Sequence, residues 1–101
     1  MSRERLPNRR ASELREVEAL NLRFTVSVSK YPDGRPAELF ITNHKAGSAA
    51  GIMASDLAVV CSIALQYGVP VEVIRKALMR DAQGRATSPL GVVLDLLEGG
   101  T

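Results

Sequence analysis

The residue types best suited to binding an anion lie together in the segment Lys45-Ala46-Gly47-Ser48. Ser48 is a candidate N-cap of a long helix, and the first amides and the dipole of that helix would favour an anion beside Lys45 and His44. The Gly-x-x-x-x-Gly-Lys-Ser/Thr spacing of a P-loop is absent. Lys45, Gly47 and Ser48 are therefore a candidate anion site, but a turn glycine followed by a capping serine is the preferred interpretation.

A second group of charges could bind a polyanion. Four of the first ten residues are arginines: Arg3, Arg5, Arg9 and Arg10. They stand against one acidic residue, Glu4, whereas residues 24–101 hold equal numbers of basic and acidic side chains. Such an arm could contact phosphates in a weak, salt-dependent manner. Aromatic residues for base stacking are not interleaved and no DNA-binding motif is present, so nucleic acid is not the expected partner and a solvated or partner-bound arm is preferred.

The remaining reactive side chains do not combine into a catalytic or metal site. Cys61 is the only cysteine and His44 the only histidine, which argues against the usual zinc patterns. Because Cys61 lies in an apolar run, we expect a buried and unreactive thiol. Asp56 in the same run could be a buried acid, but such residues more often face solvent or pair with arginine. We predict no catalytic residue, no metal ligand and no cofactor, and hence no enzyme activity of the isolated chain.

The element that must position these groups is the run from Gly47 to Val71, in which Asp56 is the only charged side chain. It predicts a helix at about 48–67 that ends before a left-handed Gly68. A helix that is apolar nearly all round must be covered on several sides. We therefore expect the sheet and two further helices, or a second copy of the chain, to enclose it.

One strip of this helix carries small polar side chains: Ser48, Ser55, Ser62 and Gln66. The strip could let another helix approach closely, or it could be a narrow face left to solvent, and the two interpretations weigh equally. A homodimer across this helix or across an exposed edge strand is a candidate assembly. The run approaches the length of a membrane span, but its polar residues and its flanks do not suit an anchor, so we expect no membrane partner.

Strands are predicted before the long helix and two shorter helices after it. The expected strands are at about 11–20, 23–31 and 37–42, and the shorter helices at about 70–80 and 89–98. In the middle strand Phe24, Val26 and Val28 alternate with polar residues. The segment 11–20 also fits a helical spacing, and it is assigned as a strand because the middle strand needs an antiparallel neighbour. The order predicts an α+β fold, an antiparallel sheet of two to three strands followed by three helices.

Length and composition fit one small domain. With 101 residues, nearly half of them apolar, the chain can form a single core. We divide it into a basic extended arm, residues 1–10, and one domain, residues 11–101. No secretory signal is recognised at the N-terminus, and we expect a reducing, cytoplasmic location.

Four segments, taken in this order and spacing, resemble one protein family. They are Leu6-Pro7-Asn8-Arg9-Arg10, Asp33-Gly34-Arg35 with Ala37-Glu38-Leu39-Phe40-Ile41, His44-Lys45-Ala46-Gly47-Ser48, and Ser62 to Glu72. Together they resemble the TSCPD-type domain found in the C-terminal region of adenosylcobalamin-dependent (class II) ribonucleotide reductases. The resemblance spans about residues 6–97.

The resemblance implies an α+β fold and an association with nucleotide metabolism, but it transfers no catalytic residue. The catalytic barrel of those reductases is not in this chain, and neither are the cysteine motif of the domain nor the terminal redox-active cysteine pair. We therefore expect a stand-alone, non-catalytic interaction or regulatory module. The alternatives are a detached component that completes a reductase subunit in trans, or a weak polyanion binder that uses the arginine arm.

Overall fold

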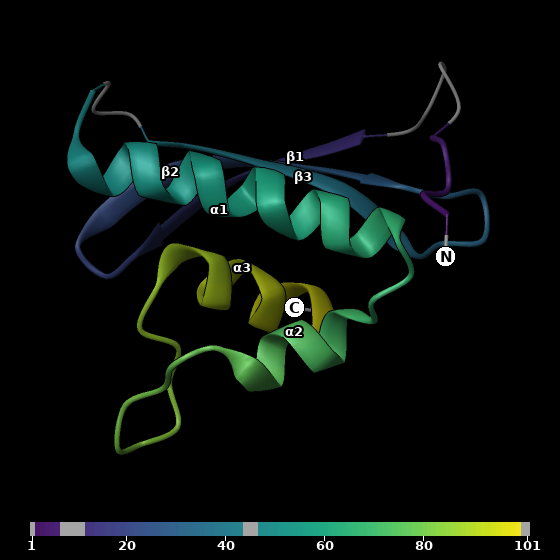
Figure 1. The fold of residues 1–101 in the computed structure, drawn as a ribbon. Coiled ribbons are helices and arrows are strands. Elements are labelled where there is room, and N and C mark those ends of the chain that lie inside the picture. The colour runs from purple at the N-terminus through teal and green to yellow at the C-terminus, as the bar shows by residue number, and fades with distance from the viewer. Residues whose placement is uncertain (1, 7–11, 44–46, 100–101) are drawn as a thin grey trace.

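The computed structural model describes residues 2–6, 12–43 and 47–99 (Figure 1). It confirms the α+β fold, a three-stranded antiparallel sheet followed by three helices. The strands are β1 (Ser12–Ala19), β2 (Leu22–Lys30) and β3 (Pro36–Asn43), in the spatial order β1-β2-β3. The helices are α1 (Ala49–Gln66), α2 (Val71–Ala77) and α3 (Pro89–Gly99).

The segment that fitted both a helix and a strand is the strand β1. A two-residue turn joins it to β2, with Ala19 opposite Leu22 and with Leu20 and Asn21 at positive φ, 56° and 60°. This backbone matches the twist of a tight hairpin, which holds the two strands in register from the turn to Ser12. The turn chemistry therefore overrides the helical spacing of the apolar residues.

The second hairpin follows the predicted turn. The amide of Tyr31 donates to the carbonyl of Arg35 at 2.9 Å, and Gly34 has φ 93°, a value that suits glycine. The Asp33 carboxylate accepts hydrogen bonds from the Arg35 amide and side chain, and these contacts hold the pKa of Asp33 below its usual value. The turn leads directly into β3.

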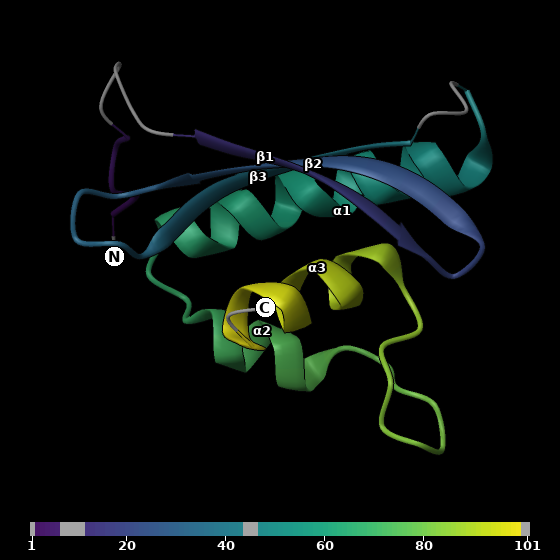
Figure 2. The same cartoon turned by 180° about the vertical axis from the view of Figure 1, so that it is seen from behind.

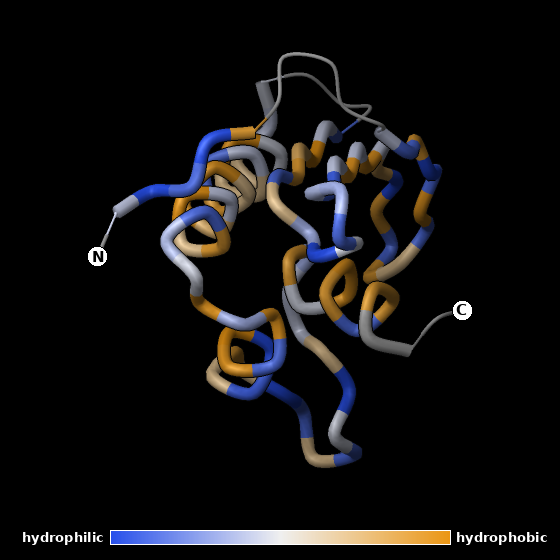
Figure 3. The backbone as a smooth tube through the Cα atoms, turned by 90° about the vertical axis from the view of Figure 1, so that its right-hand side faces the viewer, coloured by the Kyte–Doolittle hydropathy of each residue, from blue (hydrophilic) through white to orange (hydrophobic). Residues whose placement is uncertain are grey.

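One face of the sheet forms the core. Phe24, Val26, Val28, Leu39 and Ile41 are buried on that face, where they meet Leu90, Val93 and Leu94 of α3 and small side chains of α1. Seen from the two sides in Figures 1 and 2, the helices lie on one side of the strands, and no helix covers the other side. The alternation of apolar and polar residues along the strands is visible in Figure 3.

Helix α1 is not the enclosed central element that the sequence led us to expect. It lies along β3, at the border of the sheet, and α2 packs against α3 instead of covering it. One third of its length is buried, and by length and composition alone it is the one helix in the described residues that could span a membrane. Enclosure by the sheet and two further helices is therefore wrong, because the small sheet covers only one side of the helix, whereas enclosure by a second copy stays a prediction.

Helix α2 is shorter than the predicted 70–80. It ends at Ala77, and Arg80 then forms an isolated β-bridge with Ala86. The Arg80 guanidinium donates to both carboxylate oxygens of Asp95 on α3, at 2.6 and 2.9 Å, and Arg75 of α2 donates at 3.3 Å. The hydrogen bonds from Arg80 are the main reason that the pKa of Asp95 lies below its usual value. These charges hold α2 and the following loop against α3.

Candidate functional site

Several exposed apolar side chains lie on the side of α1 that faces away from the sheet, which we call the outer face of α1. It consists of Ile52, Met53, Leu57, Val59, Val60, Ile63 and Tyr67, each between 38% and 63% exposed. Asp56, also exposed, is the only charged residue among them. Together they form an exposed, contiguous apolar patch, a feature that marks interaction sites in soluble proteins.

The outer face of α1 is fixed in place because the opposite side of the helix hydrogen-bonds to the edge of β3. The hydroxyl of Ser62 accepts from the amide of Leu39 at 2.9 Å. It also lies within donor distance of two carbonyls, Leu39 at 3.0 Å and Ala58 at 2.8 Å. With one hydrogen it donates to one of them at a time. The buried Ser62 side chain thus contacts both the amide and the carbonyl of Leu39, which point away from β2.

Two further side chains extend this contact along the strand. The Ser55 hydroxyl donates to the carbonyl of Ile41 at 2.9 Å, and the Gln66 amide donates to the carbonyl of Ala37 at 3.1 Å. Residues 37, 39 and 41 are alternate positions of β3, the ones whose backbone groups point to the same side of the strand. We call this side the covered edge. Three residues of the polar strip, Ser55, Ser62 and Gln66, therefore meet a strand edge, which neither interpretation of the strip predicted. Ser55 is nevertheless exposed to solvent.

The thiol of Cys61 lies on the buried side of α1. It is 3% exposed, and burial raises its pKa to about 11. A thiol with this pKa is almost fully protonated near neutral pH, and the thiolate is the nucleophilic form. The prediction that Cys61 is buried is therefore confirmed, and its lack of reactivity stays a prediction.

Part of the candidate anion site lies in the described residues. Ser48 is the N-cap of α1, and its hydroxyl accepts from the amide of Gly51 at 3.1 Å. Gly47 precedes it with φ 76°, and Lys45 and His44 lie outside the described residues. The capping role of Ser48 is confirmed, while anion binding by Lys45, Gly47 and Ser48 stays a prediction.

Residues 2–6 of the arm lie against the body of the protein. The amide of Glu4 donates to the carbonyl of Gln66 at 2.8 Å, and the Tyr31 hydroxyl donates to the carbonyl of Glu4 at 2.8 Å. The Arg3 side chain donates to the Gln66 side chain at 2.5 Å, and Arg35 pairs with the Glu4 carboxylate at 3.0 Å. This part of the arm is therefore attached at the end of α1.

The arginines of the arm do not form a described basic patch. Arg3 contacts Gln66, Arg5 is exposed, and Arg9 and Arg10 lie outside the described residues. Arg35 stacks over the ring of Tyr31 at 4.7 Å. The pKa of Tyr31 is raised, first by burial and then by the charge of Glu4. Polyanion contact by the arm stays a prediction, as does the division of the chain at residue 10.

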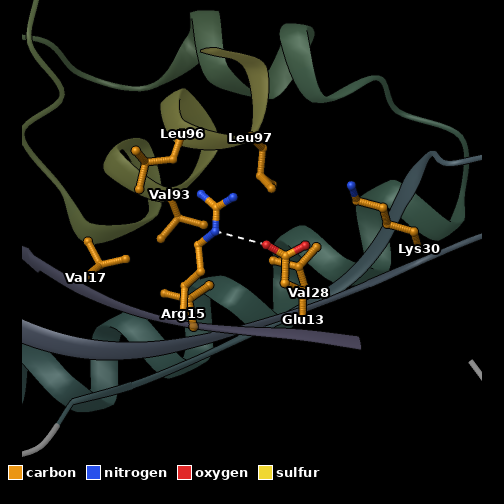
Figure 4. Close-up of a pocket in the computed structure, with 9 residues that line it drawn as sticks. Glu13, Arg15, Val17, Val28, Lys30, Val93, Leu96 and Leu97 are labelled. Atoms are coloured by element: carbon orange, nitrogen blue, oxygen red, sulfur yellow. Dashed lines mark hydrogen bonds and ion pairs between the residues drawn. The ribbon is translucent and has the colours of Figure 1, made fainter. Parts of the chain in front are cut away.

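A hollow of about 130 Å³ opens between β1, β2 and α3 (Figure 4). Its lining combines apolar and charged side chains: Glu13, Arg15, Val17, Val26, Val28, Lys30, Val93, Leu96 and Leu97. Glu13 and Arg15 pair at 3.1 Å, and both lie on the helix side of β1. Sites for drug-sized ligands measure about 300–1,000 Å³, so this hollow fits a side chain better than a nucleotide. The sequence signal for it is the alternation of Glu13, Arg15 and Val17 on one side of β1.

The described residues offer little for catalysis. Across residues 2–6, 12–43 and 47–99 there is no group of three His, Cys, Asp or Glu side chains that could hold a metal ion. What the arrangement does provide is a rigid helix with an apolar outer face. Binding of another protein surface is the chemistry that it suits.

Comparison with known proteins gives the family. Residues 4–98 match the TSCPD domain family. Over 72 residues the chain is 46% identical to a vitamin B12-dependent ribonucleotide reductase of Rhodopirellula baltica. These residues make up 71% of this chain and 7% of that protein. The chain is 39% and 34% identical over 70 residues to the proteins of the same name from Agrobacterium fabrum and Bradyrhizobium diazoefficiens, covering 69% of this chain and 6% of each relative. No solved structure matches.

These matches confirm the resemblance derived from the four sequence segments. The chain corresponds to less than a tenth of the length of these reductases, so their activity does not transfer with the similarity. The match covers all three strands and nearly all of the three helices. The chain therefore belongs to the TSCPD domain family.

Proposed function

We propose that this chain is a cytoplasmic interaction module that binds a ribonucleotide reductase polypeptide and performs no catalysis itself. The single observation that carries the proposal is the outer face of α1, an exposed and nearly uncharged apolar surface. The core of a protein interface is depleted of charged residues in the same way.

The relatives suggest the partner. In the vitamin B12-dependent reductases the matching segment is a small part of a much longer chain. A domain within a longer chain packs against other domains of the same polypeptide, and an apolar helix face is suited to such a contact. This chain would then dock on a reductase polypeptide, either to regulate it or to complete it as a component in trans.

The test uses two purified proteins, this chain and a vitamin B12-dependent reductase from which the TSCPD domain has been removed. We expect a complex in sedimentation velocity, and we expect Val60→Asp to abolish it, because Val60 lies in the middle of the outer face of α1 and is 63% exposed. Val73→Asp is the matched control, since Val73 is 57% exposed but lies on α2. Absence of a complex, or equal loss in both variants, would contradict the proposal.

A second measurement separates the regulatory role from the catalytic one. The isolated chain, supplied with adenosylcobalamin and a thiol, should not reduce a ribonucleotide. Adding it to the shortened reductase distinguishes the two forms of the proposal: recovery of lost activity supports completion in trans, and a changed rate of an already active enzyme supports regulation. Turnover by the isolated chain would contradict both.

A further inference from the structure

Asp56 lies in the middle of the outer face of α1 and is the only charged residue of that helix. On a helix surface, the nearest neighbours of a residue stand three and four positions before and after it. For Asp56 these neighbours are Ile52, Met53, Val59 and Val60, all of them apolar and between 46% and 63% exposed. Asp56 is exposed as well, so water solvates its carboxylate as long as nothing covers the face.

The chain itself supplies no counter-charge for this carboxylate. In the part of the chain that the structure describes, Asp56 takes part in no ion pair and in no side-chain hydrogen bond. Along the sequence, no lysine or arginine stands between Lys45 and Arg75. A partner that covers the outer face of α1 therefore either brings a positive charge to Asp56 or buries a carboxylate without one. The second alternative is strongly unfavourable, because an ionised group loses its hydration and gains nothing in return.

We propose that the surface that covers the outer face of α1 carries a cationic side chain opposite Asp56, set among apolar residues. This inference rests on the proposed function, because it concerns the reductase polypeptide that would bind there. An arginine suits the position better than a lysine, since its guanidinium is weakly hydrated and donates two parallel hydrogen bonds to a carboxylate. Arginine is also enriched in protein interfaces, whereas lysine is depleted.

The same carboxylate argues against two other occupants of the face. A second copy that used its own outer face would bring apolar side chains and another Asp56, because this face carries no basic residue. A lipid surface would place the carboxylate in hydrocarbon or beside anionic headgroups, and both are unfavourable. A polypeptide with a matching positive charge fits both the apolar neighbours and the charge between them.

Replacement of Asp56 by leucine tests the proposal through the sign of its effect. Surface plasmon resonance measures binding of this chain to the vitamin B12-dependent reductase from which the TSCPD domain has been removed. With a cation opposite, Asp56→Leu leaves that cation buried and unpaired, so the dissociation constant should rise about tenfold or more. Without a cation opposite, the added apolar side chain should tighten binding. Unchanged or tighter binding would therefore overturn the proposal.

Replacement by asparagine removes the charge and keeps the size of the side chain. Asp56→Asn should weaken binding in the same direction, mainly through faster dissociation, because a pair inside an interface acts once contact is made. Glu18→Gln is the matched control, since Glu18 is an exposed carboxylate on β1, outside the outer face of α1. Equal effects of the two amide variants would overturn the proposal. Urea unfolding of each variant checks that the fold is intact, as expected for exposed positions.

Failure of this inference and failure of the proposed function give different results. Absence of a complex with the wild-type chain would overturn both. A complex that is lost in Val60→Asp but kept or tightened in Asp56→Leu would support the reductase interaction and overturn the cationic partner. A stable dimer of this chain alone that is lost in Val60→Asp would show that a second copy covers the face, and it would overturn the inference as well.

Discussion

The covered edge of β3 and the edge of β1 that faces away from β2, which we call the open edge, present the same kind of backbone groups, but their surroundings differ. At the covered edge, side chains of Ser55, Ser62 and Gln66 meet the groups of alternate residues. At the open edge, charged residues line the strand and no helix of the described chain lies alongside. The comparison indicates that the covered edge is part of the fold, because side chains of α1 satisfy its backbone groups.

The largest effect is expected from Ser62→Ala at the covered edge. The substitution leaves the buried amide of Leu39 without its acceptor and should lower the free energy of unfolding by about 2–3 kcal/mol, measured by urea denaturation. Ser55→Ala is the control, because Ser55 is exposed and makes one such bond, to Ile41. Equal losses in the two variants would show that burial of the hydroxyl does not matter.

High pH should destabilise the fold through Cys61, which lies in the core on the buried side of α1. Its pKa is raised from 9.0 to about 11, so between these values the unfolded chain ionises and the folded chain does not. Stability is therefore complete below pH 9 and is lost as pH rises toward 11, by roughly 2–3 kcal/mol in total. Denaturation of the wild type and of Cys61→Ala at several pH values measures this slope, which should be smaller in the variant. Parallel curves would contradict it.

Gln66→Leu should have an intermediate effect at the end of the covered edge. It removes the donor to the Ala37 carbonyl and the acceptor of Arg3, and about 1 kcal/mol of stability should be lost. Hydrogen exchange at the Glu4 amide should also become faster, because the arm loses one of its contacts. Gln83→Leu, in an exposed turn, should change neither measurement.

The smallest effect on the folded monomer is expected at the open edge. Arg15→Ala removes an ion pair whose two side chains are about half exposed, and its cost should stay within about 0.5 kcal/mol. Unfolding at low protein concentration, where any dimer is dissociated, measures this cost. A loss comparable to that of Ser62→Ala would show that the open edge also holds the fold together.

Much of the fold could be predicted from the sequence because its signals are local. Alternation identified β2, the Asp33-Gly34 turn identified the second hairpin, and Ser48 and Gly68 marked the ends of α1. Helix α2 was predicted too long. Its end depends on Arg80, which forms a bridge with Ala86 and an ion pair with Asp95, and both partners lie outside the segment predicted as helix.

The candidate surfaces were harder to predict. In a helix that is apolar nearly all round, hydrophobic periodicity does not indicate which side is buried. The small side chains of Ala54, Ala58 and Cys61 are buried, while the larger side chains of Met53 and the rest of the outer face are exposed. If the largest apolar side chains were the buried ones, the opposite side of the helix would face the sheet. The reason is geometric, because a helix can approach a strand edge closely only through small side chains.

The sequence by itself determined the family, the order of the elements and the chemical character of Cys61. It also supplied the serines and the glutamine of α1, but it did not state what they bind. Only the tertiary structure decided that they face the backbone of β3, and hence that the bulky apolar residues point outward. The physical reason is that such a hydrogen bond forms only when the helix and the strand lie at a suitable distance and angle to each other. The spacing of residues within the helix does not specify that arrangement.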